Sequence, residues 1–422
     1  MSPSPQRPTS ARAALASAPA TGVTYVLAEA AKLGFWSGHP DWANLAQGQP
    51  ESGPIEGAPP RLDALALQPE DHAAGPVNGI EELREAIALH LNTLYRKGRD
   101  SKYTVENIAV GQGGRLAVAR ALAPLGAFEV GYVLPDATAY EELSGLRLDR
   151  AHALAVRAHE ELGFVLDTER LLAEIDKHRL SALLLANPSN PCGNLIQGDE
   201  LDALVAGARE RDALLLLDES ASHYIWTPDG GPAAGPVSAA ASIEDVDDDP
   251  VLIFDGLGKN FRYPGWRLGW TAGPKELIES IRRASNALDG GASRLSQRAA
   301  LEVLEPERAA QETHATRVHF AKKRKLMLRR LGELGIHVPA PPRGGFACWG
   351  SLAQMPPPFD DGMAFFRRAL QYRVLAVPGR FFDAGRDEEE HAYAQWMRFS
   401  FAPSMDQLRM GLDRLAQMLR GD

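Results

Sequence analysis

The chain has 422 residues, too many for one hydrophobic core and suited to two packed domains. Its formal net charge of -10 argues against non-specific binding to nucleic acid or to an anionic membrane surface. Hydrophobic residues make up 45% of the chain and charged residues 24%, as in ordinary globular proteins. The two cysteines, Cys192 and Cys348, offer no disulfide framework and suit a reducing cytoplasm.

The first residues are unlike the rest of the chain. Residues 1–20 are rich in proline, serine and alanine, and we expect them to form a flexible tail. They lack an apolar core of signal-peptide length. No later stretch reaches the roughly 18 consecutive apolar residues that a membrane-spanning helix needs. We therefore expect a cytoplasmic protein that does not enter a membrane.

Helical and strand patterns alternate through the middle of the chain, which predicts an α/β domain. Residues 79–91 have apolar residues at helical spacing and acidic residues in the first turn, where the helix dipole favours them. A strand at 107–110 is followed by a glycine turn and a helix at 116–122. Three short apolar runs are typical of buried parallel strands: residues 181–186, 213–217 and 251–254.

Each of these three runs ends in polar residues. They are followed by segments that begin at Asn187, Asp218 and Asp255. Ligands bind at the carboxyl ends of the strands in open parallel sheets. The three polar segments should therefore converge on one site.

From about residue 296 the pattern changes to charged helices, predicted at 297–304 and 307–334. A glycine break at 343–346, a strand-like segment and a helix at 406–419 follow, which together predict a smaller α+β domain. We expect a tail at 1–20, a segment at 21–60 that joins the small domain, a large domain at 61–295 and the small domain at 296–422.

The segment 256–270 contains the strongest chemical signal. Lys259 lies directly after a buried strand, in a glycine-flanked turn. Burying a lysine is costly unless its amine reacts or pairs, and a desolvated lysine is the nucleophile that Schiff-base chemistry requires. Arg267 lies further along the same segment and offers a forked cation that suits a phosphate.

The segment Gly-Lys259-Asn-Phe-Arg-Tyr-Pro-Gly-Trp-Arg267-Leu-Gly resembles the Ser-Lys-x-x-x-x-Pro-Gly-x-Arg-x-Gly signature of fold-type I pyridoxal 5′-phosphate (PLP) enzymes, the class I and II aminotransferases. The resemblance implies that PLP forms a Schiff base with Lys259. It also implies an aspartate aminotransferase-like fold, with a mostly parallel sheet in the large domain and a small α+β domain. The resemblance further implies a homodimer with active sites at the subunit interface.

Further motifs of the same family occur in the expected order. Residues 187–193, Asn-Pro-Ser-Asn-Pro-Cys-Gly, resemble its Asn-Pro-x-Asn-Pro-Thr-Gly motif, which implies that Asn190 binds the ring hydroxyl of PLP and lies beside the substrate carboxylate. Asp218 and Glu219 resemble the pair whose aspartate binds the pyridine nitrogen. A carboxylate there keeps this nitrogen protonated, so that the ring can accept electrons.

Three more segments complete the resemblance. Gly113-Gly114-Arg115 resembles the phosphate turn, where backbone N–H groups and a helix N-terminus meet the anion. Residues 396–400 resemble the segment whose arginine, here Arg398, binds the substrate α-carboxylate bidentately. Residues 44–50 resemble the glycine loop on the substrate side, which includes Gly48.

The resemblance therefore implies one catalytic residue, Lys259, and no metal site. Substrate contacts are expected from Gly48, Asn190 and Arg398. The expected cofactor contacts are Gly113, Gly114, Arg115, Tyr140, Asn190, Asp218, Lys259 and Arg267.

The chain departs from the family where active-site aromatics are usual. Ala221 stands where a tyrosine donates to the ring hydroxyl, and Ala74 where a tyrosine reaches the neighbouring subunit's phosphate. Ala137 stands where an aromatic stacks on the ring, although nearby Tyr140 is an alternative stacking residue. Hydroxyl residues that usually help to bind phosphate are replaced by Gly256 and Gly258.

Two explanations of the alanines are open. In the first, the lost contacts are of little consequence or are supplied by Tyr140, His223 or Tyr224. In the second, the pocket has been widened to admit a bulky second substrate, since each aromatic ring buries roughly 150–250 Å².

The family resemblance favours an aminotransferase of biosynthesis, which acts on an α-amino acid through an external aldimine and a quinonoid. An alternative is a non-transaminating PLP enzyme of specialised metabolism. It would carry out elimination, replacement or carbon–carbon bond-forming annulation, for example on S-adenosylmethionine with a pyridinium nucleotide. A third class, transcription regulators with this fold, needs a basic DNA-binding domain that we do not find before residue 44.

Overall fold

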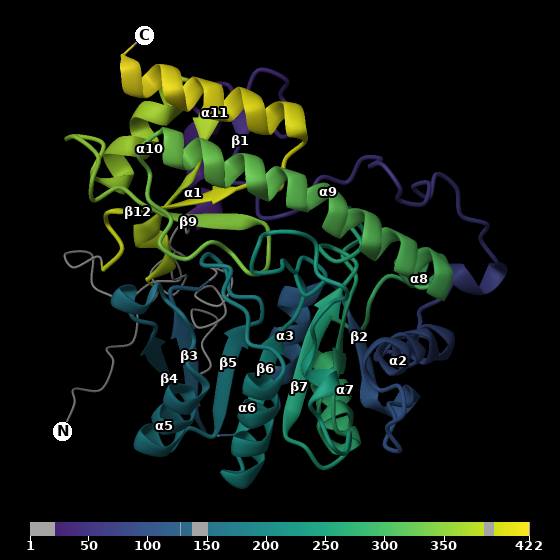
Figure 1. The fold of residues 1–422 in the computed structure, drawn as a ribbon. Helices are drawn as coiled ribbons and strands as arrows, with labels where there is room; N and C mark the ends of the chain where they lie inside the picture. The colour runs from purple at the N-terminus through teal and green to yellow at the C-terminus, as the bar shows by residue number, and fades with distance from the viewer. Residues whose placement is uncertain (1–21, 127, 137–150, 384–391, 422) are drawn as a thin grey trace, which may run out of the picture.

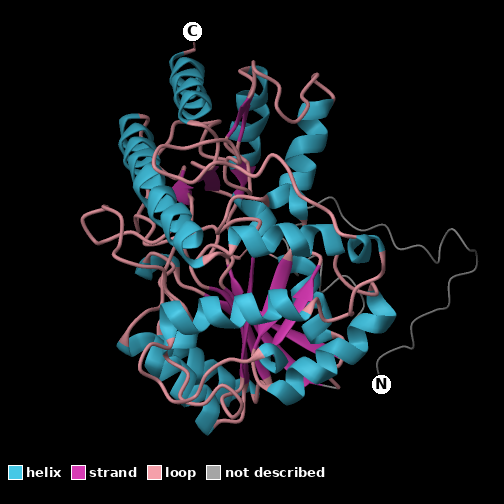
Figure 2. Cartoon of the chain, turned by 90° about the vertical axis from the view of Figure 1, so that its right-hand side faces the viewer, coloured by secondary structure: helices cyan, strands magenta, loops and turns pink. Residues whose placement is uncertain are grey.

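The computed structural model describes residues 22–126, 128–136, 151–383 and 392–421. Figure 1 shows a large sheet flanked by helices in the lower half and a smaller group of helices and strands above it. Figure 2, turned by 90°, shows the strands enclosed by helices. None of the helices in the described residues is long and apolar enough to cross a membrane.

Seven strands of the described chain form the large sheet, in the order β2-β8-β7-β6-β5-β3-β4. All neighbouring strands are parallel except at β8, which is antiparallel to both β2 and β7. The sheet is therefore mostly parallel, as expected. Its strands are β2 Ile108–Gly111, β3 Phe128–Leu134, β4 Ala151–Arg157, β5 Ala182–Ala186, β6 Leu214–Asp218, β7 Val251–Gly256 and β8 Gly269–Ala272.

Helices cover both faces of this sheet, which is why its central strands are almost continuously apolar. Every residue of β5 and β7 is buried. In β5, Leu183 and Leu185 pack in one core cluster with α2, α5 and α6, while Ala182 and Leu184 pack on the opposite face with α3 and α7. The covering helices are α2 Glu81–Tyr95, α3 Gly114–Leu122, α5 Thr168–His178, α6 Asp199–Glu210 and α7 Lys275–Leu288.

A second core joins the two ends of the described chain. Two small sheets belong to it: β1 pairs in parallel with β10, and β11, β12 and β9 form an antiparallel sheet. Val26, Trp42 and Leu45 share this core with Phe365 and Phe399, so the N-terminal segment packs against the C-terminal part. The strands are β1 Ala43–Asn44, β9 Ala347–Ser351, β10 Val374–Leu375, β11 Val377–Pro378 and β12 Trp396–Ser400.

The remaining α-helices of the described residues are α1 Gly22–Ala31, α8 Arg294–Val303, α9 Pro306–Glu333, α10 Gly362–Gln371 and α11 Met405–Arg420. In Figure 1 the long helix α9 runs from the side of the large sheet to the upper group, where α11 lies above it.

Candidate active site

The carboxyl ends of β5, β6 and β7 meet at one cavity. Asp218, the last residue of β6, pairs in register with Ala186 of β5 and Phe254 of β7, so the three strands end at nearly the same level. The cavity has a volume of about 520 Å³. The three polar segments at the ends of β5, β6 and β7 were predicted to converge, and this is confirmed. They contribute Asn190, Asp218 and Lys259, respectively, to the same cavity. Lining residues include Gly48, Gly113, Gly114, Arg115, Asn190, Asp218, Lys259, Arg267 and Arg398.

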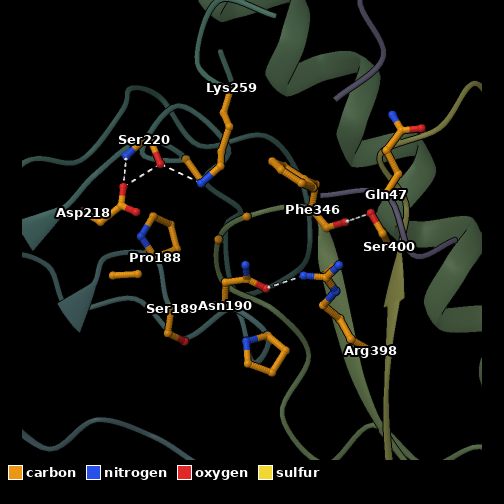
Figure 3. Close-up of a pocket in the computed structure, with 17 residues that line it drawn as sticks. Gln47, Pro188, Ser189, Asn190, Asp218, Ser220, Lys259, Phe346, Arg398 and Ser400 are labelled. Carbon is orange, nitrogen blue, oxygen red and sulfur yellow. Dashed lines mark hydrogen bonds between the residues drawn. The ribbon is translucent and has the colours of Figure 1, made fainter. Parts of the chain in front are cut away.

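A smaller adjoining pocket extends from Lys259 and Arg398 towards the second core. Apart from Asp218, Lys259 and Arg398, it is lined mainly by small and uncharged residues, together with the aromatic ring of Phe346. Figure 3 shows this pocket, with Lys259 and Asp218 on one side and Arg398 on the other. Gln47, Ala221 and Ser400 also line it.

Lys259 lies in the turn between β7 and β8. The backbone of this turn is held because the Tyr224 hydroxyl donates to the Lys259 carbonyl over 2.8 Å. The Arg262 N–H donates to the same carbonyl over 3.1 Å. With its backbone fixed, the lysine extends its amine into the cavity, where Nζ donates to Ser220 Oγ over 2.7 Å (Figure 3).

Asp218 is held at the end of β6 by the residue two positions further on. The Ser220 N–H donates to Asp218 Oδ1 over 2.9 Å, and the Ser220 hydroxyl donates to the same oxygen over 2.5 Å. These two hydrogen bonds stabilise an ionised carboxylate facing the cavity. A fixed negative charge there suits a protonated ring nitrogen.

Glycines shape the end of the cavity near α3. Gly113, with a φ of +85°, precedes the helix, and a Cβ on it would lie 2.7 Å from Arg267 Nη2. A Cβ on Gly269 would lie 2.8 Å from the Gly114 nitrogen. The backbone N–H groups at the start of α3 and the Arg267 guanidinium therefore lie together, and Arg115 lines the same cavity. Such a donor set fits a phosphate dianion.

The same close packing explains one departure from the family motif. A Cβ on Gly256 would lie 2.6 Å from the Leu268 carbonyl oxygen, so β8 excludes a serine there. At Gly258 the nearest atom to such a Cβ, Pro264 Cα, is 3.7 Å away, and a side chain would fit.

Arg398 projects from β12 and is only 4% exposed. Its Nη2 donates to the Ala46 carbonyl over 2.7 Å, and its Nη1 donates to Asn190 Oδ1 over 3.3 Å. Nε is buried without a hydrogen-bond partner in the described residues. Burial lowers the pKa of Arg398 to about 10. A buried guanidinium with an unused N–H suits a carboxylate ligand.

Asn190 reaches the cavity from the loop after β5. Asn187 braces this loop, because its side chain donates to the Ile196 carbonyl over 2.8 Å and accepts from the Ile196 N–H over 3.0 Å. Asn190 therefore lies between Arg398 and the Lys259 side of the cavity, as Figure 3 shows.

The segment that follows Gly48 is anchored by a buried ionic network that the motifs did not indicate. Glu51 accepts from Lys323 and from His319, both over 2.7 Å. Burial lowers the pKa of Lys323 to about 8, although the charge of Glu51 opposes this. Burial alone would raise the pKa of Glu51, but the hydrogen bond from His319 and the charge of Lys323 lower it. A basic residue every few positions along α9 was the only sequence signal.

The aromatic residues considered as substitutes for the missing tyrosine lie elsewhere. The Tyr224 ring packs against Phe320 and Phe346, and its hydroxyl is bound to the Lys259 carbonyl. His223 is buried beside His90. Neither therefore reaches the cavity, so this explanation is wrong for these two residues.

Three positions carry alanine where the family has an aromatic residue, and the structure describes two of them. Ala221 lines the smaller pocket, and Ala74 is exposed. Ala137 and the expected cofactor contact Tyr140 lie outside the described residues.

The described site fits PLP in its charges and in its shape. It combines a primary amine, a fixed carboxylate and a glycine-lined cradle beside Arg267, and a Cβ at Gly113 would fill part of that cradle. The buried Arg398 provides a separate place for a carboxylate in the same cavity.

Comparisons with known proteins agree with this chemistry. The family model described as aminotransferase class I and II matches residues 40–415. Aspartate/prephenate aminotransferase of Thermus thermophilus is 29% identical over 347 residues, which are 82% of this chain and 82% of that protein. Aspartate aminotransferase of Streptomyces avermitilis is 26% identical over 438 residues, covering 99% of this chain and 98% of its own.

Solved structures give the same fold. The structure of Thermus thermophilus aspartate aminotransferase with maleate has a TM-score of 0.78 at 26% identity, covering 98% of this chain and 100% of its own. An aminotransferase from Mycobacterium tuberculosis also has a TM-score of 0.78, at 23% identity, covering 99% of this chain and 100% of its own. At that identity the second structure supports the fold alone.

Proposed function

The chain belongs to the class I and II aminotransferase family, and from that premise we propose how its residues divide the work of a PLP-dependent aminotransferase. Enzyme class and cofactor follow from the family. The roles of single residues are our proposal, and the cavity at the ends of β5, β6 and β7 supports them.

One group of residues would hold the cofactor. Lys259 would bind it covalently, since its amine extends into the cavity. Arg267, Arg115 and the backbone at Gly113 and Gly114 would hold the phosphate, which the glycine cradle and its cations support. Asp218 would pair with the ring nitrogen and Asn190 with the ring hydroxyl. When bound, PLP supplies an electron sink that allows the α-proton of an amino acid to leave.

A second group would hold and convert the substrate. Arg398 would bind the α-carboxylate, because it is buried in the same cavity and has an unused N–H. The loop at Gly48 would close the substrate side. With the carboxylate fixed, Lys259 Nζ would remove the α-proton and later return it, acting as general base and then as general acid.

The observation that carries this proposal is that Lys259, Asp218 and Arg398 line one cavity. The test is to mix the PLP-loaded protein with single amino acids, without a keto-acid acceptor. We expect conversion of the cofactor to pyridoxamine phosphate and release of one equivalent of keto acid. Lys259→Ala should lower this rate at least a thousandfold, because the variant lacks the amine that would transfer the proton.

Lys275→Ala is the matched control, since Lys275 lies on the surface in an ion pair with Asp247. Consumption of the amino acid by the wild-type protein without conversion of the cofactor to pyridoxamine phosphate would contradict aminotransfer and indicate elimination or replacement. The comparisons give no support to that alternative, because the relatives named above are aminotransferases.

We also propose a cytoplasmic homodimer that works in biosynthesis. The large apolar side chains of Leu89 and Leu94 on α2 are 53% and 38% exposed, and Leu295 at the start of α8 is 44% exposed. Burying such side chains against a second copy would be favourable. Cys192 and Cys348 are both free, which supports a reducing compartment. Sedimentation of the PLP-loaded protein measures the oligomeric state, and a monomer would contradict the dimer.

A further inference from the structure

Ser220 lies between the two charged groups at the centre of the site. Its Oγ lies 2.7 Å from Lys259 Nζ and 2.5 Å from Asp218 Oδ1. Figure 3 shows both hydrogen bonds as dashed lines. Ser220 lines the cavity together with both of its partners. The family motifs assign no role to this position, which is two residues after the aspartate.

The direction of each hydrogen bond follows from the number of protons available. A serine hydroxyl has one proton, and a carboxylate oxygen can only accept. The proton of Ser220 is therefore donated to Asp218 Oδ1, and Ser220 Oγ remains only as an acceptor. Lys259 must then turn an N–H towards Ser220, whether its amine is charged or neutral. In the neutral amine this turns the lone pair away from Ser220.

We propose that Ser220 is a positioning residue that presents the Lys259 amine to incoming PLP. Asp218 fixes the direction of the Ser220 hydroxyl, and the hydroxyl fixes the amine. This inference rests on the proposed function, because it assumes that PLP is attached through Lys259. In that step Nζ forms a C=N bond to the aldehyde carbon, and the aldehyde oxygen leaves as water with the two amine protons.

The residues next to Ser220 offer no second hydroxyl to the Lys259 amine. Ala221 has no hydroxyl, and the hydroxyl of Tyr224 is bound to the backbone carbonyl of Lys259. Removing the Ser220 hydroxyl would leave Asp218 in place, because the Ser220 N–H still donates to Oδ1 over 2.9 Å. The carboxylate and the phosphate cradle would then stay intact while the amine loses its partner.

Removal of the Ser220 hydroxyl is therefore predicted to slow PLP attachment without an equal loss of affinity for the cofactor. In Ser220→Ala the amine samples orientations that cannot attack, so we expect PLP attachment to slow roughly tenfold. The affinity for 4-deoxypyridoxine 5′-phosphate, which has no aldehyde, should change less than about threefold. Attachment is followed by stopped-flow absorbance on cofactor-free protein, and the analogue by fluorescence titration.

Ser220→Thr restores a hydroxyl and should recover most of the rate. Ser222→Ala is the matched control, because Ser222 is buried two residues further on and contacts Asn260 rather than the cavity. It should attach PLP at the wild-type rate.

Two results would overturn the inference alone: attachment at the wild-type rate in Ser220→Ala, or an equal loss of rate, analogue affinity and melting temperature. The second result would mean that the hydroxyl only supports the fold. Failure of the wild-type protein to attach PLP, or attachment in Lys259→Ala, would overturn the proposed function together with this inference.

Discussion

Glu219 shows how differently two adjacent carboxylates behave at the end of β6. Asp218 faces the cavity, whereas Glu219 is 2% exposed and accepts from the Ala239 N–H over 2.7 Å. Burial raises the pKa of Glu219 to about 8, although hydrogen bonds from Ser238 and Ala239 oppose this. The raised pKa favours the protonated form of Glu219 at neutral pH, so of these two carboxylates Asp218 supplies the negative charge to the site.

This raised pKa predicts a pH-dependent stability. The unfolded chain releases the Glu219 proton near its ordinary pKa of 4.5, but the folded protein keeps it up to about pH 8. The contribution of this residue to stability is therefore complete below pH 4.5 and is lost as pH rises towards 8. Glu219→Gln keeps the acceptor for Ala239 and removes the titration. We expect the variant to be more stable than wild type by about 4 kcal/mol at pH 8, with little difference at pH 4.5.

Urea unfolding of the cofactor-free protein at both pH values measures this difference. Glu210→Gln, at a side chain that is 77% exposed, is the control and should not change the pH dependence. Parallel pH profiles for Glu219→Gln and wild type would contradict the prediction.

The site residues that sequence reasoning found are those with motif neighbours. Lys259, Asp218, Asn190, Arg267 and Arg398 were each predicted from a motif, and the structure brings all of them to one cavity. Ser220 could not be singled out, because a serine after a strand-terminal aspartate is ordinary turn chemistry. Its importance appears only once the Lys259 amine is placed beside it.

At the scale of elements, burial on both faces decided which strands were predictable. The leucine runs of β5 and β6 and the apolar run of β7 read as buried strands because helices cover both sides of them. β3 was missed because Glu129 and Gly131 interrupt its apolar pattern near the edge of the sheet. The two-residue strands β1, β10 and β11 carry no periodic signal, since pairing of distant segments alone defines them. The predicted domain boundaries stay a prediction.

The contact between β7 and β8 predicts that substitution by serine is tolerated at Gly258 but not at Gly256. Gly256→Ser would place a Cβ 2.6 Å from the Leu268 carbonyl oxygen and 2.7 Å from Gly269 Cα, within the paired strands. We expect a loss of about 1–3 kcal/mol in the free energy of unfolding. Gly258→Ser meets nothing closer than 3.7 Å, so its stability should stay within about 0.5 kcal/mol of wild type.

The two variants are compared by urea unfolding without cofactor, and each serves as the control for the other. Gly258→Ser adds a hydroxyl at the phosphate end and should also bind inorganic phosphate more tightly. Equal stability of the two variants would show that β8 moves to make room at Gly256.

At the scale of the whole molecule, α9 connects the N-terminal segment to the Lys259 turn. Near one end, Glu312 accepts from Arg262 of that turn over 2.7 Å and pairs with Arg61 over 3.1 Å. Further along, Lys323 pairs with Glu51 over 2.7 Å and donates to the Ala402 carbonyl over 3.1 Å. Arg262 also donates to the carbonyl of Glu51. The substrate-side loop at Gly48 is thus tied to α9 on one side and to the Lys259 turn on the other.

This network predicts that a residue remote from the chemistry controls substrate binding. Lys323 is fully buried, and Lys323→Met would fill its volume while leaving Glu51 its hydrogen bond with His319. Removing one member of a buried pair usually costs about 3–5 kcal/mol, and the partial exposure of Glu51 should reduce this loss to about 2 kcal/mol. The loop at Gly48 should become less ordered, so KM for the amino acid should rise several-fold while kcat changes little.

The neighbouring Lys322, whose side chain is 59% exposed, is the matched control, and Lys322→Met should leave stability and KM unchanged. A fall in kcat with an unaltered KM would instead mean that α9 acts on the Lys259 turn through Arg262 rather than on the substrate loop.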